Sequence, residues 1–121
     1  MVRRLLLGLF LAHAFLALCV PGIASASTTR VSAFYYPWYG TAAADGAYLH
    51  WGQDGHSPPN DIASSYYPAI GLYSSSSRVV IGQQMDEIRG AGIDEIAVSW
   101  WGRGSVEDGR LAAVAAAARA D

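Results

Sequence analysis

The sequence predicts an α/β fold in which two strands alternate with two helices. The order along the chain is strand, long loop, helix, strand, turn and helix. This alternation predicts parallel strands joined by right-handed crossovers. Two strands and two helices cannot cover both faces of a parallel sheet, and a complete (β/α)8 TIM barrel needs about 250 residues. We therefore expect the N-terminal portion of a barrel, incomplete at its C-terminus; the alternative is a small α/β domain complete in itself.

Residues 1–26 have the parts of a secretory signal peptide. Two arginines precede an apolar run at residues 5–20, Pro21 follows the run, and small residues lead up to Ala26. A membrane anchor is the alternative, but the run is shorter than the roughly 20 residues that a span needs. We expect cleavage after Ala26, a secreted or periplasmic protein without a membrane anchor, and a folded part at residues 27–121.

The first strand is expected at residues 31–36, where β-branched and aromatic residues precede Pro37. Residues 38–76 then show no sustained period of two or 3.6 and are rich in Gly, Pro, Ser and Asp. Loops of that length are uncommon in compact domains and usually functional.

A helix is expected at residues 78–91 because apolar residues recur there at helical spacing. Ser77 can cap its start and Gly92 can end it. A short buried strand follows within residues 93–100. Ser105, with an acidic residue three positions later, predicts the cap of a second helix that is rich in alanine.

Charge and composition exclude several function classes. After the signal peptide the chain has six Arg, no Lys and ten acidic residues, so no basic patch points to nucleic acid. Asp94 and Glu95 enter the second strand at its N-terminal end and are interpreted as solvated charges. The histidines and aspartates of the long loop match no metal-ligand spacing, so we expect neither a metal nor a cofactor.

Aromatic residues gather where both expected strands end. In α/β barrels the functional site lies at the carboxyl ends of the strands. Flat aromatic faces suit sugar rings, and tyrosine adds a hydroxyl for hydrogen bonding; packing in the core is the alternative role for each ring. The predicted carbohydrate-binding residues are Tyr35, Tyr36, Trp38, His50, Trp51 and Trp101. No residue of this chain is predicted to be catalytic, since no pair of carboxylates suited to glycoside hydrolysis stands out.

Several ordered blocks resemble the opening of glycoside hydrolase family 99, the endo-α-1,2-mannosidases and mannanases. The resemblance starts at the first strand, continues through the long loop and ends at the second strand, before the turn at Gly102. The matching blocks are Phe34-Tyr35-Tyr36-Pro37-Trp38-Tyr39-Gly40, Asp45-Gly46-Ala47-Tyr48-Leu49-His50-Trp51, His56-Ser57-Pro58-Pro59-Asn60-Asp61, Gly71-Leu72-Tyr73 and Val98-Ser99-Trp100-Trp101.

The resemblance implies a (β/α)8 barrel that cleaves within chains containing α-mannose, with retention of configuration. It also implies that the two catalytic glutamates lie beyond this chain. Tyr36 matches a tyrosine that contacts the sugar beside the scissile bond, and Trp101 matches an aromatic that packs on the next sugar in bacterial members. The chain would then supply part of the sugar-binding rim and be inactive alone. A non-catalytic carbohydrate-binding barrel and a truncated product without activity are the alternatives.

Overall fold

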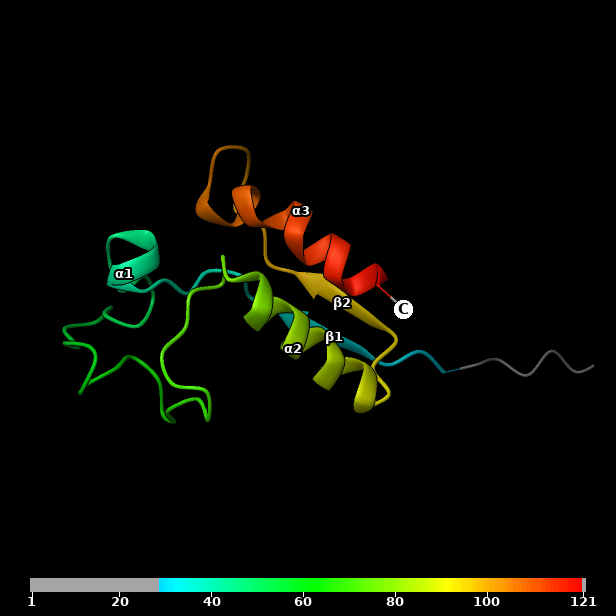
Figure 1. Ribbon diagram of the computed structural model, residues 1–121, viewed down its shortest axis with the longest axis horizontal. Coiled ribbons are helices and arrows are strands. Elements are labelled where there is room, and N and C mark those ends of the chain that lie inside the picture. The colour runs from blue at the N-terminus through cyan, green and yellow to red at the C-terminus, as the bar shows by residue number, and fades with distance from the viewer. Residues whose placement is uncertain (1–28, 121) are drawn as a thin grey trace, which may run out of the picture.

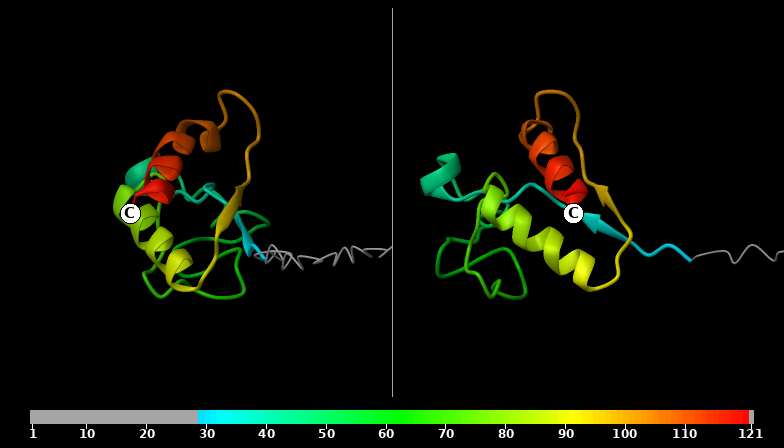
Figure 2. Two further views of the ribbon diagram at one scale, coloured as in Figure 1. Left: turned by 90° about the vertical axis from the view of Figure 1, so that its right-hand side faces the viewer. Right: turned by 45° about the vertical axis from the view of Figure 1, so that its right-hand side comes forward.

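The computed structural model describes residues 29–120, and the predicted signal peptide lies outside this range. The described part is a two-stranded parallel sheet with two helices on one face and a long loop at one end (Figures 1 and 2). The elements are β1 (Ser32–Tyr35), α1 (Ala42–Asp45), α2 (Arg78–Gly90), β2 (Glu95–Val98) and α3 (Val106–Arg119). The predicted order of two strand–helix units is confirmed, and α1 is an addition within the long loop.

The register of the sheet places β1 and β2 level with one another. Ser32 pairs with Glu95, and Tyr35 pairs with Val98. The ladder continues past the strand ends, because the Ser99 N–H donates to the Tyr35 carbonyl at 2.8 Å. Both strands therefore finish at the same edge of the sheet.

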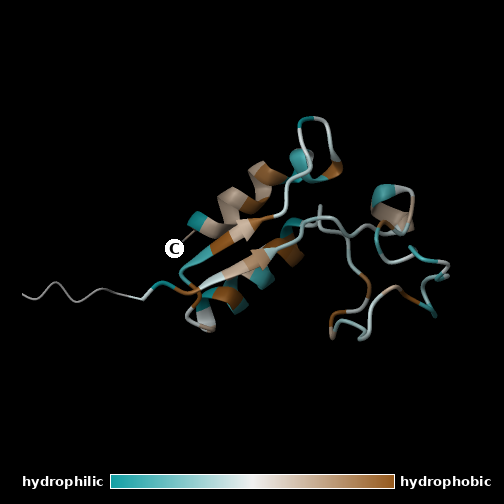
Figure 3. Cartoon of the chain, turned by 180° about the vertical axis from the view of Figure 1, so that it is seen from behind, coloured by the Kyte–Doolittle hydropathy of each residue, from teal (hydrophilic) through white to brown (hydrophobic). Residues whose placement is uncertain are grey.

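One face of the sheet packs against α2 and α3. The buried residues of this core are Tyr35 from β1, Ile81 and Met85 from α2, and Val114 from α3. The other face is uncovered in the described part of the chain, and Phe34 on that face is 79% exposed. Figure 3 shows this open face toward the viewer, with the helices behind the strands.

The helix ends follow the predicted capping pattern. The Ser77 hydroxyl accepts from the Val80 N–H, and the Ser105 hydroxyl accepts from the Asp108 N–H at 3.1 Å. Gly92 has a φ of 71°, the left-handed conformation that glycine adopts readily after a helix. Serine thus supplies an acceptor for an otherwise unpaired N–H at the start of each long helix.

Asp94 and Glu95 are exposed, but they do more than face solvent. An Asp94 carboxylate oxygen accepts from the Val31 N–H at 2.8 Å, and the Ser32 hydroxyl donates to Glu95. The interpretation as solvated charges was therefore incomplete, because both carboxylates tie the beginning of β1 to β2.

Among residues 29–120, no helix is long and apolar enough to cross a membrane.

The long loop is packed on itself. Trp51 is 2% exposed, its ring stacks on Tyr39 at 3.9 Å between centroids, and its indole N–H donates to the Tyr73 carbonyl at 3.0 Å. Gly40 and Leu49 are also in close approach, since a Cβ on Gly40 would lie 2.7 Å from the Leu49 side chain. These contacts give the loop a small aromatic core of its own.

Candidate functional site

The two aromatic strand ends lie at one edge of the sheet, as the parallel register requires. Tyr36 directly follows β1 and is 43% exposed, and Trp101 follows β2 and is 71% exposed. The Trp101 indole N–H donates to the Ser99 hydroxyl at 3.2 Å, which orients the ring. We call this edge, with the residues that stack on it, the aromatic rim: Tyr36, Trp38, His50, Trp100 and Trp101.

The first half of the rim is a stack of three rings. Tyr36 and Trp38 have centroids 4.5 Å apart with an angle of 27° between their planes. Trp38 and His50 also have centroids 4.5 Å apart, at an angle of 14°. His50 has a φ of 56°, a conformation that costs free energy in residues other than glycine, and its Nδ1 contacts the Gln53 side chain at 3.1 Å. The Trp38 indole N–H is buried without an acceptor in the described part of the chain.

The second half of the rim is fixed by Asp108, in the first turn of α3. One carboxylate oxygen accepts from the Trp100 indole N–H and the other from the Gly104 N–H, both at 2.9 Å. The Gly104 N–H and then the Trp100 N–H lower the pKa of Asp108. In the predicted capping pattern, the Asp108 side chain would accept from the backbone N–H of Ser105. It instead binds the turn at Gly104 and the indole of Trp100.

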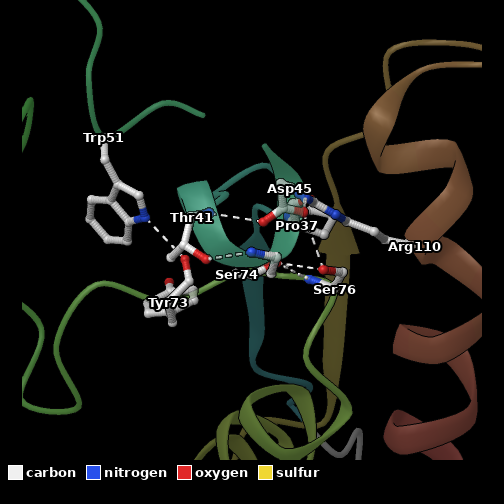
Figure 4. A network of polar contacts seen from close by, with 9 residues as sticks. Pro37, Thr41, Asp45, Trp51, Tyr73, Ser74, Ser76 and Arg110 are labelled. Atoms are coloured by element: carbon white, nitrogen blue, oxygen red, sulfur yellow. Dashed lines mark hydrogen bonds and ion pairs between the residues drawn. The ribbon is translucent and has the colours of Figure 1, made fainter. Parts of the chain in front are cut away.

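A buried ion pair joins the first half of the rim to α3 (Figure 4). Arg110 is 6% exposed, and its guanidinium donates to Asp45 Oδ1 at 2.7 Å and to the Pro37 carbonyl at 2.8 Å. Asp45 also accepts from the Thr41 N–H at 2.8 Å and from the Ser76 hydroxyl at 3.2 Å. Burial alone would raise the pKa of Asp45, but hydrogen bonds from Ser74, Thr41 and Arg110, together with the charge of Arg110, lower it.

Two of the predicted sugar-binding residues are buried. Tyr35 is 8% exposed on the helix-facing side of β1, and its hydroxyl donates to Gln84 Oε1 at 2.7 Å. Burial, with a smaller contribution from Tyr73, raises the pKa of Tyr35 to about 12. Trp51 lies within the aromatic core of the loop. Both side chains are therefore largely enclosed by the fold, although Tyr35 also lines the groove between β1 and α2, and a sugar-binding role for either residue stays a prediction.

Two cavities are relevant to the candidate site, and the first of them adjoins the rim. A groove of about 380 Å³ runs between β1 and α2, and Tyr36 lines it together with Phe34, Tyr39 and Ile88. A second cavity, of about 440 Å³, lies in the long loop and is lined by polar residues that include Asp54 and His56.

The polar cavity contains a histidine that is oriented by an aspartate. His56 Nδ1 lies 2.7 Å from Asp61 Oδ1, and this hydrogen bond lowers the pKa of the Asp61 carboxyl. Residues 29–120 contain no group of three or more His, Cys, Asp or Glu side chains placed to hold a metal ion.

In a comparison with known protein families, the sequence model of glycosyl hydrolase family 99 matches residues 27–118 of this chain. The chain belongs to this family. It is 42% identical over 87 residues to the glycoprotein endo-alpha-1,2-mannosidase of Rattus norvegicus, covering 59% of this chain and 19% of that protein. It is 35% identical over 92 residues to the glycoprotein endo-alpha-1,2-mannosidase-like protein of Homo sapiens, covering 63% and 20%.

The fold of this family 99 chain is also similar to solved structures. The family 99 endo-alpha-mannosidase from Bacteroides thetaiotaomicron, in complex with bis-tris-propane, matches with a TM-score of 0.63 and 29% identity. The match covers 74% of this chain and 26% of that structure. The chain thus spans about a fifth of the length of the curated relatives that it matches and about a quarter of the solved structure.

Four of the six predicted family 99 binding residues therefore lie together on the rim: Tyr36, Trp38, His50 and Trp101. Three residues that hold the rim in place were not predicted as functional from the sequence: Asp45, Arg110 and Asp108. Asp108 was predicted only as the acidic residue three positions after the Ser105 cap, and that spacing was the available signal. Nothing local in the sequence pairs Asp45 with Arg110, because 65 residues separate them.

Proposed function

We propose that the protein is a glycoside hydrolase that cleaves internal α-mannosidic linkages with retention of configuration. In this proposal residues 27–121 form the first part of a (β/α)8 barrel and supply part of its sugar-binding rim, while the catalytic glutamates lie outside this chain. Membership of family 99 and the names of the relatives, which are endo-α-mannosidases, support the reaction class. The partner is then an oligosaccharide or polysaccharide that contains α-mannose.

The observation that carries the proposal is the shared edge of Tyr36 and Trp101. An exposed indole face can stack on the C–H groups of a sugar ring, while a neighbouring phenol hydrogen-bonds to its hydroxyls. Trp101 is the most exposed ring of the rim, and Tyr36, directly after β1, is the first ring of the stack. In the proposal Trp101 stacks on a sugar one position away from the bond that breaks, and Tyr36 hydrogen-bonds to the sugar at that bond.

The test is the hydrolysis and binding of α-1,2-linked manno-oligosaccharides by the intact protein. We expect internal cleavage, and we expect Trp101→Ala to weaken binding by about 1–3 kcal/mol through loss of the stacking face. Tyr36→Phe should reduce the rate more than the affinity if its contact strengthens in the transition state. Tyr66→Ala is the matched control, because Tyr66 is an exposed aromatic of the long loop and lies outside the rim.

The outcome separates the enzyme from its alternatives. Binding without hydrolysis would support the non-catalytic carbohydrate-binding barrel. A Trp101→Ala variant that melts at a much lower temperature but binds with unchanged affinity would assign this ring to packing and refute the rim as a sugar site.

We also propose that the protein is secreted or periplasmic after removal of residues 1–26. The charged start, apolar run and small residues before Ser27 support this location. N-terminal sequencing of exported protein should begin at Ser27, whereas exported protein that retains Met1 would contradict the proposal.

A further inference from the structure

The start of α3 contacts both halves of the aromatic rim. Asp108 binds the Trp100 indole and the turn at Gly104. Two residues later, Arg110 binds the Pro37 carbonyl. Pro37 lies directly between Tyr36 and Trp38 in the chain. A single helix start therefore connects two aromatic groups that come from different strands.

The Arg110 contacts restrict the backbone on which Tyr36 and Trp38 are carried. The proline ring fixes φ at Pro37, and the guanidinium holds the carbonyl of the same residue at 2.8 Å. The second arm of the guanidinium binds Asp45, whose other contacts come from Thr41 and from Ser76, just before α2. The planar guanidinium fork fixes two acceptors at once, which a lysine ammonium does not do in the same geometry.

The Asp45–Arg110 pair contributes more to the positions of the groups that it binds than to the net stability of the fold. Removing two charges from water costs about as much as their attraction returns, so a buried pair often adds little stability over a well-packed apolar pair. Its main effect is to hold defined groups at defined positions. Here those groups are the Pro37 carbonyl and the segment around Asp45 (Figure 4).

We propose that Arg110 is a positioning residue that sets the spacing between the Tyr36–Trp38 half and the Trp100–Trp101 half of the rim. The ligands that depend on this spacing are α-mannosides of two or more units, which span both halves. This inference rests on the proposed sugar-binding function. A monosaccharide contacts one half alone and is insensitive to the spacing.

The test compares Arg110→Lys with Val114→Ala in the intact protein. Lysine keeps a positive charge beside Asp45 but lacks the second arm that holds the Pro37 carbonyl. Val114 lies one turn further along α3, is fully buried and does not contact the rim, so its variant reports a general loss of core stability. The measurements are affinity for α-1,2-mannobiose, affinity for methyl α-mannoside, and melting temperature.

For Arg110→Lys we expect mannobiose affinity to fall about tenfold, which corresponds to about 1.4 kcal/mol, while monosaccharide affinity stays unchanged. Val114→Ala should lower the melting temperature and leave both affinities unchanged. The proposal is overturned if Arg110→Lys leaves both affinities unchanged, or if both affinities fall together with the melting temperature, as they would for a merely structural role.

A measurement without ligand separates this inference from the proposed function. In protein labelled with 5-fluorotryptophan, Arg110→Lys should shift or broaden the fluorine signal of Trp38 and leave that of Trp51 unchanged. Trp51 is the internal control because its contacts lie within the loop core. An unchanged Trp38 signal overturns the positioning role whatever the protein binds, whereas a changed signal without sugar binding by the wild-type protein overturns the sugar-binding function alone.

Discussion

Replacing Trp51 by phenylalanine tests whether this residue holds the long loop together or binds sugar. The substitution keeps a ring that can stack on Tyr39 but removes the N–H that donates to the Tyr73 carbonyl. Leaving a buried acceptor without its donor costs about 1–3 kcal/mol, and the smaller ring loses part of a contact worth about 0.5–1.5 kcal/mol. We expect a loss of about 2–3 kcal/mol in the stability of the loop.

The assays for Trp51→Phe are thermal unfolding and limited proteolysis. Because Trp51 lies inside the loop, cleavage between residues 52 and 72 should become faster, and the melting temperature should fall. Tyr66→Ala is the control: this ring in the same loop is almost fully exposed, and such surface changes usually alter stability by less than about 0.5 kcal/mol. If Trp51→Phe leaves proteolysis and melting unchanged while mannoside affinity falls, Trp51 is a ligand contact and does not hold the loop together.

Three further predictions concern the ion pair, a helix cap and the open sheet face. The pKa of Asp45 is lowered in the folded state. The ionised carboxylate therefore stabilises the fold above pH 3.8, its ordinary pKa, and this stabilisation is lost as the pH falls through the lowered pKa. Asp45→Asn should be less stable than the wild type at neutral pH and should lose less stability in acid, which unfolding measurements at several pH values would show. Ser105→Ala removes the acceptor for the Asp108 N–H and should cost about 1 kcal/mol, measured by chemical denaturation, whereas a cost near zero would show that the cap contributes nothing. The 121-residue chain alone should bind a hydrophobic dye at its open face around Phe34 and should not hydrolyse α-mannosides; a sharp cooperative transition in a monomer without dye binding would contradict the first expectation.

The order of strands and helices was predictable because its signals are local. Ser77 and Ser105 stand directly before their helices, Gly92 follows one of them, and the apolar stripe of α2 has a clear helical period. These signals act over three or four residues, which is the range over which capping and periodicity operate. The helix α1 has only four residues, too few for a periodic pattern, so the capping residues Thr41 and Gly46 were its only local signals and were not recognised.

The candidate site was predictable only in part, because the burial of Tyr35 and of Trp51 was not predicted, and the reasons differ. Tyr35 and Tyr36 are neighbours in an extended segment, so their side chains point to opposite faces, and both could not face the same ligand. The sequence contained that information. The burial of Trp51 was not accessible in the same way, because it depends on Tyr39 and Tyr73, which approach Trp51 through a loop without periodicity.

The alternation along β1 separates the residues that stabilise the fold from those that form the rim. Tyr35 packs toward the helices with Met85 and Val114, while Phe34 and Tyr36 lie on the open face. Substitutions on the first face should act mainly through folding, and substitutions of exposed rim residues mainly through binding. Arg110 belongs to neither group, since it is buried among the elements of the fold yet bonded to the backbone between two rim residues. Its effect on binding can therefore be detected only by comparison with a core variant such as Val114→Ala, which lowers stability without touching the rim.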